Sequence, residues 1–182
     1  MLRKILHPFY VLYQVLFAWW AAILLVAITS ICIILFGRYL KIKNGDHIPA
    51  VIWCRLTCWL FLIPVKVVDR DKYVKKDQTY IFAANHQGMF DVLAIAATCP
   101  IPLGAVLKKE LYNIPFLHQI ALCTNSFAMD REDVRQFLTV IQNVTEEVKK
   151  GRNYLIFPEG TRSRKGNEML EFHGGSFRCA TK

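Results

Sequence analysis

The groups in this sequence that could do chemistry lie in two short blocks. In the first block, residues 85–91, His86 is followed five positions later by Asp91. A neutral imidazole accepts a proton near neutral pH, and it works best when a carboxylate holds its other ring nitrogen in one tautomer. The pair could therefore deprotonate a hydroxyl that attacks a thioester carbonyl, without a serine or cysteine nucleophile. The alternative is that His86 caps a helix and Asp91 is solvated.

The second block, residues 157–163, reads Phe-Pro-Glu-Gly-Thr-Arg-Ser. Gly160 allows a tight turn with close backbone approach. Arg162 can bind a phosphate in fork geometry. Glu159 could orient Arg162 or bond a substrate hydroxyl. An ordinary turn with a surface ion pair is the alternative interpretation of this block taken alone.

Short apolar runs precede both blocks, and each predicts a buried strand: residues 79–84 and residues 153–157. Residues 133–150 carry apolar side chains at spacings of three and four, which predicts an amphipathic helix that ends at Gly151. Further strands are expected at residues 65–69, 103–107 and 126–129, and further helices after the first block and before Cys123. Strands that alternate with helices predict an α/β fold.

The N-terminal part of the chain is strongly apolar. Residues 8–37 contain no Asp, Glu, Lys or Arg, although about 20 apolar residues suffice for a membrane span. A second apolar stretch covers residues 48–65. Basic residues lie on both sides of the first run: Arg3 and Lys4 before it, and Arg38, Lys41 and Lys43 after it. This symmetry favours a hairpin or a partly embedded helix pair over a single crossing. Residues 1–63 are predicted to be a membrane-associating helical segment, and residues 64–182 an α/β domain on the cytoplasmic face.

Charge and cysteine content narrow the functional class. The net charge is +9, the sequence pI about 9.4 and the mean hydropathy +0.27. Beside an apolar N-terminus, this basic character favours anionic lipid headgroups and phosphorylated substrates over nucleic acid. The six cysteines form no Cys-x-x-Cys pair, so neither a metal site nor a bound cofactor is expected.

Together the two blocks resemble the PlsC-like glycerolipid acyltransferase family, above all its 1-acylglycerol-3-phosphate acyltransferases. The resemblance covers residues 65–178 and implies a glycerol-3-phosphate acyltransferase-like α/β domain. It implies that His86 is the general base and that Asp91 orients it. The residues that it implies for substrate binding are Lys108, Arg131, Glu159, Gly160, Thr161 and Arg162.

The sequence departs from the family pattern in two places. In the middle block, Asn125 and Ala128 stand where other residues are usual, and Arg131 alone is fully kept. The family's fourth block, an apolar segment with a Val-Pro pattern, is absent before Lys182. The resemblance therefore predicts a chain that lacks its C-terminal part and with it a portion of the acyl site.

The activity that the resemblance implies is acyl transfer from acyl-CoA or acyl carrier protein to the sn-2 hydroxyl of lysophosphatidic acid, giving phosphatidic acid at a membrane. One alternative is an acyltransferase for another lysophospholipid or for glycerol 3-phosphate. Two others are a non-catalytic, membrane-bound lipid-binding remnant and a membrane-anchored interaction domain.

Overall fold

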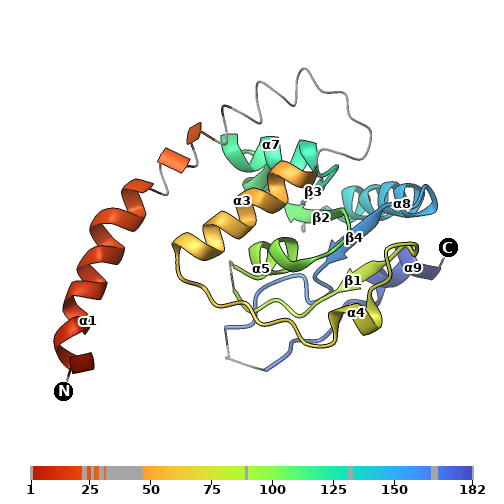
Figure 1. The fold of residues 1–182 in the computed structure, drawn as a ribbon. Helices are drawn as coiled ribbons and strands as arrows, with labels where there is room; N and C mark the ends of the chain where they lie inside the picture. Colours follow the sequence, from red (N-terminus) through yellow and green to blue (C-terminus); the bar gives the residue numbers. More distant parts are fainter. Residues whose placement is uncertain are drawn as a thin grey trace.

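A parallel β-sheet forms the centre of the molecule (Figure 1). The computed structural model describes residues 2–21, 24, 25, 27, 28, 31, 47–88, 90–130, 133–164 and 168–181. Within these residues the strands are β1 (Ile81–Ala83), β2 (Leu103–Lys108), β3 (Phe127–Met129) and β4 (Asn153–Ile156). They pair in the order β1-β4-β2-β3, and every pairing is parallel. The predicted α/β fold is confirmed.

Helices connect these strands and precede them. In chain order they are α1 (Leu2–Tyr13), η1 (Gln14–Ala18), α3 (His47–Leu60), α4 (Arg70–Tyr73), α5 (Asp91–Thr98), α6 (Lys109–Tyr112), α7 (Pro115–Cys123), α8 (Val134–Lys149), η2 (Gly174–Phe177) and α9 (Arg178–Thr181). The crossover from β1 to β2 runs through α5, and the crossover from β3 to β4 runs through α8. Strands that run parallel in one sheet need such long connections, which explains the alternation seen in the sequence.

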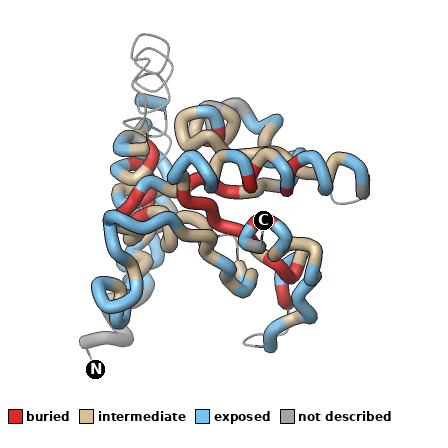
Figure 2. Tube along the Cα trace, turned by 90° about the vertical axis from the view of Figure 1, so that its right-hand side faces the viewer, coloured by how far each residue is buried: buried red, intermediate tan, exposed pale blue. Residues whose placement is uncertain are grey.

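The predicted amphipathic helix is α8, and local signals set both of its ends. The Asp133 carboxylate accepts the backbone N–H groups of Arg135 and Gln136, as an N-cap should. Gly151 follows the last turn at φ +86°, a conformation that glycine adopts without strain. The apolar side of α8 packs against one face of the sheet. The buried residues of this core are Val140, Ile141, Val144, Tyr154, Ile156 and Cys179, and Figure 2 shows buried chain concentrated at this centre.

A second core joins α3 to α5. It contains Trp53, Cys54, Cys58 and Ala97, with Leu93 and Ile120 packed against them. In addition, the Arg55 Nε–H donates to the carbonyl of Ala97 at 2.8 Å. One side of the second apolar stretch of the sequence is therefore buried against the α/β layers. Its other side exposes Ile48, Ile52 and Trp59.

The strand predicted at residues 65–69 is wrong. These residues lie outside the four strands, and Val65, Val67 and Val68 are exposed. Apolar β-branched residues predict a strand only if a neighbouring strand is there to pair with them. Within the described residues β1 pairs with β4 alone, so this segment has no place in the sheet.

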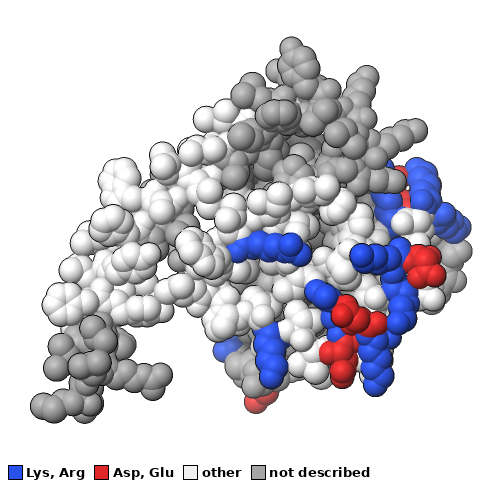
Figure 3. All heavy atoms as spheres, in the orientation of Figure 1, with Lys and Arg blue, Asp and Glu red and all other residues white. Residues whose placement is uncertain are grey.

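The N-terminal helices α1 and η1 extend away from the α/β layers (Figure 1). Several large apolar side chains there are exposed: Phe9, Tyr10, Leu12, Tyr13, Leu16, Phe17, Trp19 and Trp20. Residues 8–21 of this segment contain no acidic or basic side chain, and Figure 3 shows none there. Part of the apolar run at residues 8–37 lies outside the described residues. Among those that are described, no helix has both the length and the apolar character to cross a membrane.

Candidate active site

Sheet topology brings the two blocks together. The first block follows the carboxyl end of β1, and the second follows the carboxyl end of β4. β1 and β4 are parallel neighbours in which Ala83 pairs with Ile156. Loops that leave adjacent parallel strands emerge at the same edge of the sheet, which is where open α/β sheets bind ligands.

The imidazole of His86 and the carboxylate of Asp91 form a hydrogen bond. His86 Nδ1 lies 2.8 Å from Asp91 Oδ2, and the two side chains are 14% and 24% exposed. The same carboxylate oxygen accepts the backbone N–H groups of Gln87 at 2.7 Å and Gly88 at 2.9 Å. The expected contact between the two side chains is therefore present. Asp91 is the first residue of α5, and the loop before the helix folds back onto its carboxylate.

These contacts set the charge and the tautomer of the pair. Burial alone would raise the pKa of Asp91, but hydrogen bonds from Gly88, His86 and Gln87 outweigh it and hold that pKa below its ordinary value. The ionised carboxylate accepts hydrogen bonds only, so Nδ1 of His86 carries the proton. The other ring nitrogen, Nε2, is then the atom that can accept a proton from a substrate.

The second block contacts His86 at three points. Glu159 Oε1 accepts the backbone N–H of His86 at 2.7 Å. The backbone N–H of Ser163 donates to the carbonyl of His86 at 2.7 Å. The ring of Phe157 stacks on the imidazole, with centroids 4.2 Å apart and planes inclined by 27°. These contacts to Phe157 and Ser163 could not be found from the sequence, because they join backbone and ring atoms of distant segments.

Glu159 does not contact Arg162, as the sequence suggested it could. It is 2% exposed, and its second oxygen accepts the backbone N–H of Leu170 at 3.1 Å. Arg162 is exposed, and within the described part of the chain it forms no ion pair with Glu159. The carboxylate thus bonds backbone groups rather than the guanidinium.

Gly160 makes the predicted tight turn, with φ +68°. This backbone conformation favours glycine, and a Cβ here would also make a tight contact with Cδ2 of His173, at 3.1 Å. The backbone N–H of His173 donates to the carbonyl of Pro158 at 2.9 Å. Sequence reasoning did not single out His173, and its type and spacing carry no signal that would have done so.

The other residues predicted to bind the substrate differ in where the structure places them. Lys108 is the last residue of β2, and its ammonium pairs with Glu110 at 2.8 Å in an exposed position. Thr161 is exposed beside Arg162. Arg131 lies outside the described residues, although it follows the carboxyl end of β3. Lys108 therefore joins the same edge of the sheet as the two blocks.

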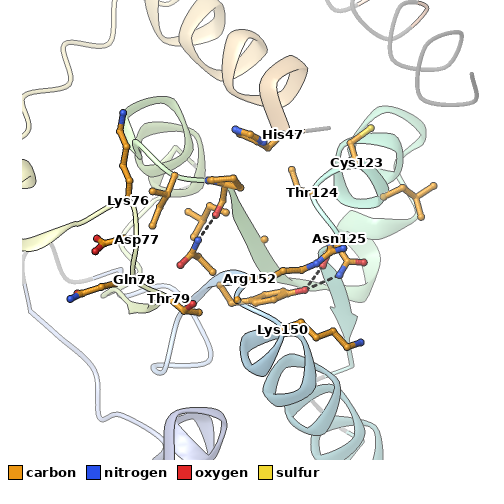
Figure 4. Close-up of a pocket in the computed structure, with 18 residues that line it drawn as sticks. His47, Lys76, Asp77, Gln78, Thr79, Cys123, Thr124, Asn125, Lys150 and Arg152 are labelled. Atoms are coloured by element: carbon orange, nitrogen blue, oxygen red, sulfur yellow. Dashed lines mark hydrogen bonds between the residues drawn. The ribbon is translucent and has the colours of Figure 1, made fainter. Parts of the chain in front are cut away.

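A cavity of about 840 Å³ opens at the opposite edge of the sheet, as Figure 4 shows. Its walls come from residues at the amino ends of β2 and β4, together with Lys76, Asn125, Lys150 and Arg152. None of the described candidate residues lines it. The pair of His86 and Asp91 is thus separated from this cavity by the length of the strands.

The described residues contain no cluster of His, Cys, Asp and Glu that could hold a metal ion. Among the thiols, burial, with a smaller contribution from Cys58, raises the pKa of Cys54 to about 12. Burial also raises the pKa of Cys99 and of Cys179. A thiol held in its neutral form is a poor nucleophile, so these three cysteines are poor candidates for a reacting group.

Sequence relatives of this chain are 1-acyl-sn-glycerol-3-phosphate acyltransferases. The protein of that name from Helicobacter pylori is 30% identical over 161 residues, which cover 87% of this chain and 65% of the relative. The one from Saccharomyces cerevisiae is 33% identical over 120 residues, which cover 65% of this chain and 39% of the relative. The one from Salmonella typhimurium is 38% identical over 101 residues, which cover 55% of this chain and 41% of the relative. The chain thus spans 39–65% of the length of these relatives.

The crystal structure of the 1-acyl-sn-glycerophosphate acyltransferase PlsC from Thermotoga maritima has the same fold. It matches with a TM-score of 0.73 at 22% identity, covering 93% of this chain and 68% of that one. The family model described as Acyltransferase matches residues 65–182. Because this match covers more than half of the sequence and includes both blocks, the chain belongs to the acyltransferase family.

Proposed function

We propose that this chain transfers an acyl group from a thioester to the sn-2 hydroxyl of lysophosphatidic acid. The observation that carries the proposal is the hydrogen bond between His86 Nδ1 and Asp91 Oδ2, which leaves Nε2 as the base. Nε2 takes the hydroxyl proton while the hydroxyl oxygen attacks the thioester carbonyl. The carbon–sulfur bond then breaks, and the departing thiolate takes the proton back from the imidazolium. The products are phosphatidic acid and the thiol carrier.

The acceptor's phosphate is proposed to bind the cations at the carboxyl edge of the sheet. Arg162 offers a fork of N–H donors, and Lys108 an ammonium on a flexible stem that would exchange Glu110 for the phosphate. We assign Arg131 to the same role from its position after β3. The turn at Gly160 offers backbone groups, and Thr161 an exposed hydroxyl, next to Arg162 in the chain. No metal or bound cofactor enters the proposal; acyl-CoA or acyl carrier protein supplies the acyl group as co-substrate.

The N-terminal helices are proposed to hold the enzyme on the cytoplasmic face of a membrane, where the lysolipid resides. Supporting this are the exposed aromatic side chains of α1, η1 and the residues after them, including Phe9, Phe17, Trp19 and Trp20. Aromatic rings with an apolar body favour the interface between headgroups and acyl chains. The division at residue 64 stays a prediction.

Thiol release tests the proposed reaction directly. The purified chain in detergent is given an acyl-CoA, with and without lysophosphatidic acid, and the lipid product is identified by mass spectrometry. We expect thiol release that depends on the acceptor and yields phosphatidic acid. Lysophosphatidylcholine and glycerol 3-phosphate serve as alternative acceptors. A folded sample that releases no thiol, with acyl-CoA or with an acyl carrier protein donor, would contradict the proposal.

Replacing Arg162 by alanine is expected to weaken acceptor binding. A hydrogen bond to a charged group contributes about 1.5–3 kcal/mol, so the Michaelis constant for lysophosphatidic acid should rise roughly 10- to 100-fold. The constant for acyl-CoA should change less than about twofold, because Arg162 is assigned to the phosphate of the acceptor and not to the thioester. Arg152→Ala, which removes a cation at the opposite edge of the sheet, is the matched control. Equal increases for both substrates would remove the assigned role.

A further inference from the structure

We infer that Glu159 is a positioning residue, which holds the catalytic histidine in place and does not bind the acceptor. The inference rests on the proposed function insofar as His86 is taken as the base. It concerns the second block as a whole, since Glu159, Ser163 and Phe157 all contact His86. In this interpretation the residues of the block have two roles. The buried ones hold the base in place, and the exposed ones after Gly160 bind the acceptor.

The burial of Glu159 supports this role. With 2% of the residue exposed, its carboxylate is out of reach of a substrate hydroxyl. Each of its two oxygens already accepts a backbone N–H, from His86 at 2.7 Å and from Leu170 at 3.1 Å. The single carboxylate therefore connects three segments: the loop after β1, the loop after β4 and the segment that follows residue 168.

The position of the imidazole depends on this connection. His86 lies in a loop outside any helix or strand, so regular secondary structure does not fix its backbone. Instead its N–H is held by Glu159 and its carbonyl by the N–H of Ser163. With the backbone fixed on both sides, stacking on Phe157 and the bond to Asp91 orient the ring. Productive proton transfer needs the donor and the acceptor within about 3 Å, so a shift of this backbone would move Nε2 out of range.

Both oxygens of Glu159 are needed as hydrogen-bond acceptors, so a variant with one acceptor tests the inference directly. A glutamine has one acceptor oxygen and one NH₂ donor. Whichever way the amide of Glu159→Gln turns, its NH₂ group faces a backbone N–H, of either His86 or Leu170. The variant keeps the shape of the side chain but breaks one of the two connections. Glu171→Gln removes an exposed carboxylate one residue beyond Leu170 and is the matched control.

The expected kinetic result separates positioning from binding. In Glu159→Gln, kcat should fall by about 10- to 100-fold, since displacement of a reacting group by 1 Å can cost roughly 100-fold. The Michaelis constant for lysophosphatidic acid should stay within about twofold of the wild type. Glu171→Gln should match the wild type in both. An increased Michaelis constant with unchanged kcat would overturn the inference, because it would make Glu159 a ligand of the acceptor. Unchanged values of both would overturn it as well.

A second readout needs no turnover. In protein labelled with ¹⁵N-histidine, the Nδ1 proton shared with Asp91 should give a downfield signal, assigned by its loss in His86→Ala. We expect that signal in the wild type and in Glu171→Gln, and we expect it shifted or broadened in Glu159→Gln. An unchanged signal in folded Glu159→Gln would overturn the inference even if activity fell. A wild type with this signal but no acyl transfer would instead count against the proposed function alone.

Thermal unfolding shows whether each variant is folded, and a second variant is available if Glu159→Gln is not. If Glu159→Gln does not fold, Glu159→Asp keeps both acceptor oxygens on a shorter side chain. The same pattern is expected there with a smaller decrease in kcat, and a change confined to the Michaelis constant would again overturn the inference.

Discussion

Replacing His86 by alanine is expected to reduce acceptor-dependent turnover by about 10²- to 10⁴-fold, the usual contribution of a general base. The physical reason is that Nε2 of His86 is the proton acceptor that the Asp91 contact leaves available at the carboxyl edge of the sheet. Without it, the acceptor hydroxyl must attack in its neutral form. The cysteines whose pKa values burial raises, Cys54, Cys58, Cys99 and Cys179, offer no substitute.

The measurement is thiol release with saturating acyl-CoA and lysophosphatidic acid. Because His86 also stacks on Phe157, the variant's thermal unfolding must be compared with that of the wild type. His118→Gln is the control: His118, in α7, bonds the carbonyl of Tyr112 at the end of α6 and belongs to neither block. Turnover retained within about threefold in a folded His86→Ala sample would refute the general-base mechanism.

The second large effect is expected from Asp91→Asn. The neutral amide has no charge to stabilise the imidazolium that forms. If its NH₂ group takes the place of Oδ2, it also opposes the Nδ1 proton of His86 and the backbone N–H groups of Gln87 and Gly88. The imidazole then loses its fixed tautomer, a change that costs about 10²- to 10⁴-fold in turnover in histidine–carboxylate pairs. The Michaelis constants should change little, because neither substrate touches this carboxylate.

The same variant has a signature in the pH dependence of stability. The pKa of Asp91 is lower in the folded chain than its ordinary value of 3.8. A carboxyl group with a lowered pKa stabilises the fold fully above that ordinary value, and the stabilisation is lost as the pH falls through the folded pKa. The free energy of unfolding of the wild type should therefore exceed that of Asp91→Asn near pH 7, and the difference should shrink below pH 3.8. A difference that does not change with pH would contradict the ionised carboxylate.

Local signals in the sequence were enough to predict the fold class and the central pair. Apolar runs that end just before a block mark β1 and β4, and the spacing from His86 to Asp91 fits a loop that enters a helix. The strand at residues 65–69 was mispredicted because its pairing partner is a property of the whole sheet. The contacts of Glu159 were missed for a similar reason: the bond to His86 spans 73 positions, and no local pattern specifies it.

The strand order has a consequence for how the site is completed during folding. β4 is the last strand in the chain among the described residues, yet it lies between β1 and β2. β1 and β2 therefore cannot be joined into one sheet until residues 153–156 have inserted between them. Non-local pairing of this kind forms late, since it must close long loops of chain. The second block enters with this strand, so completion of the sheet and immobilisation of the histidine are a single event.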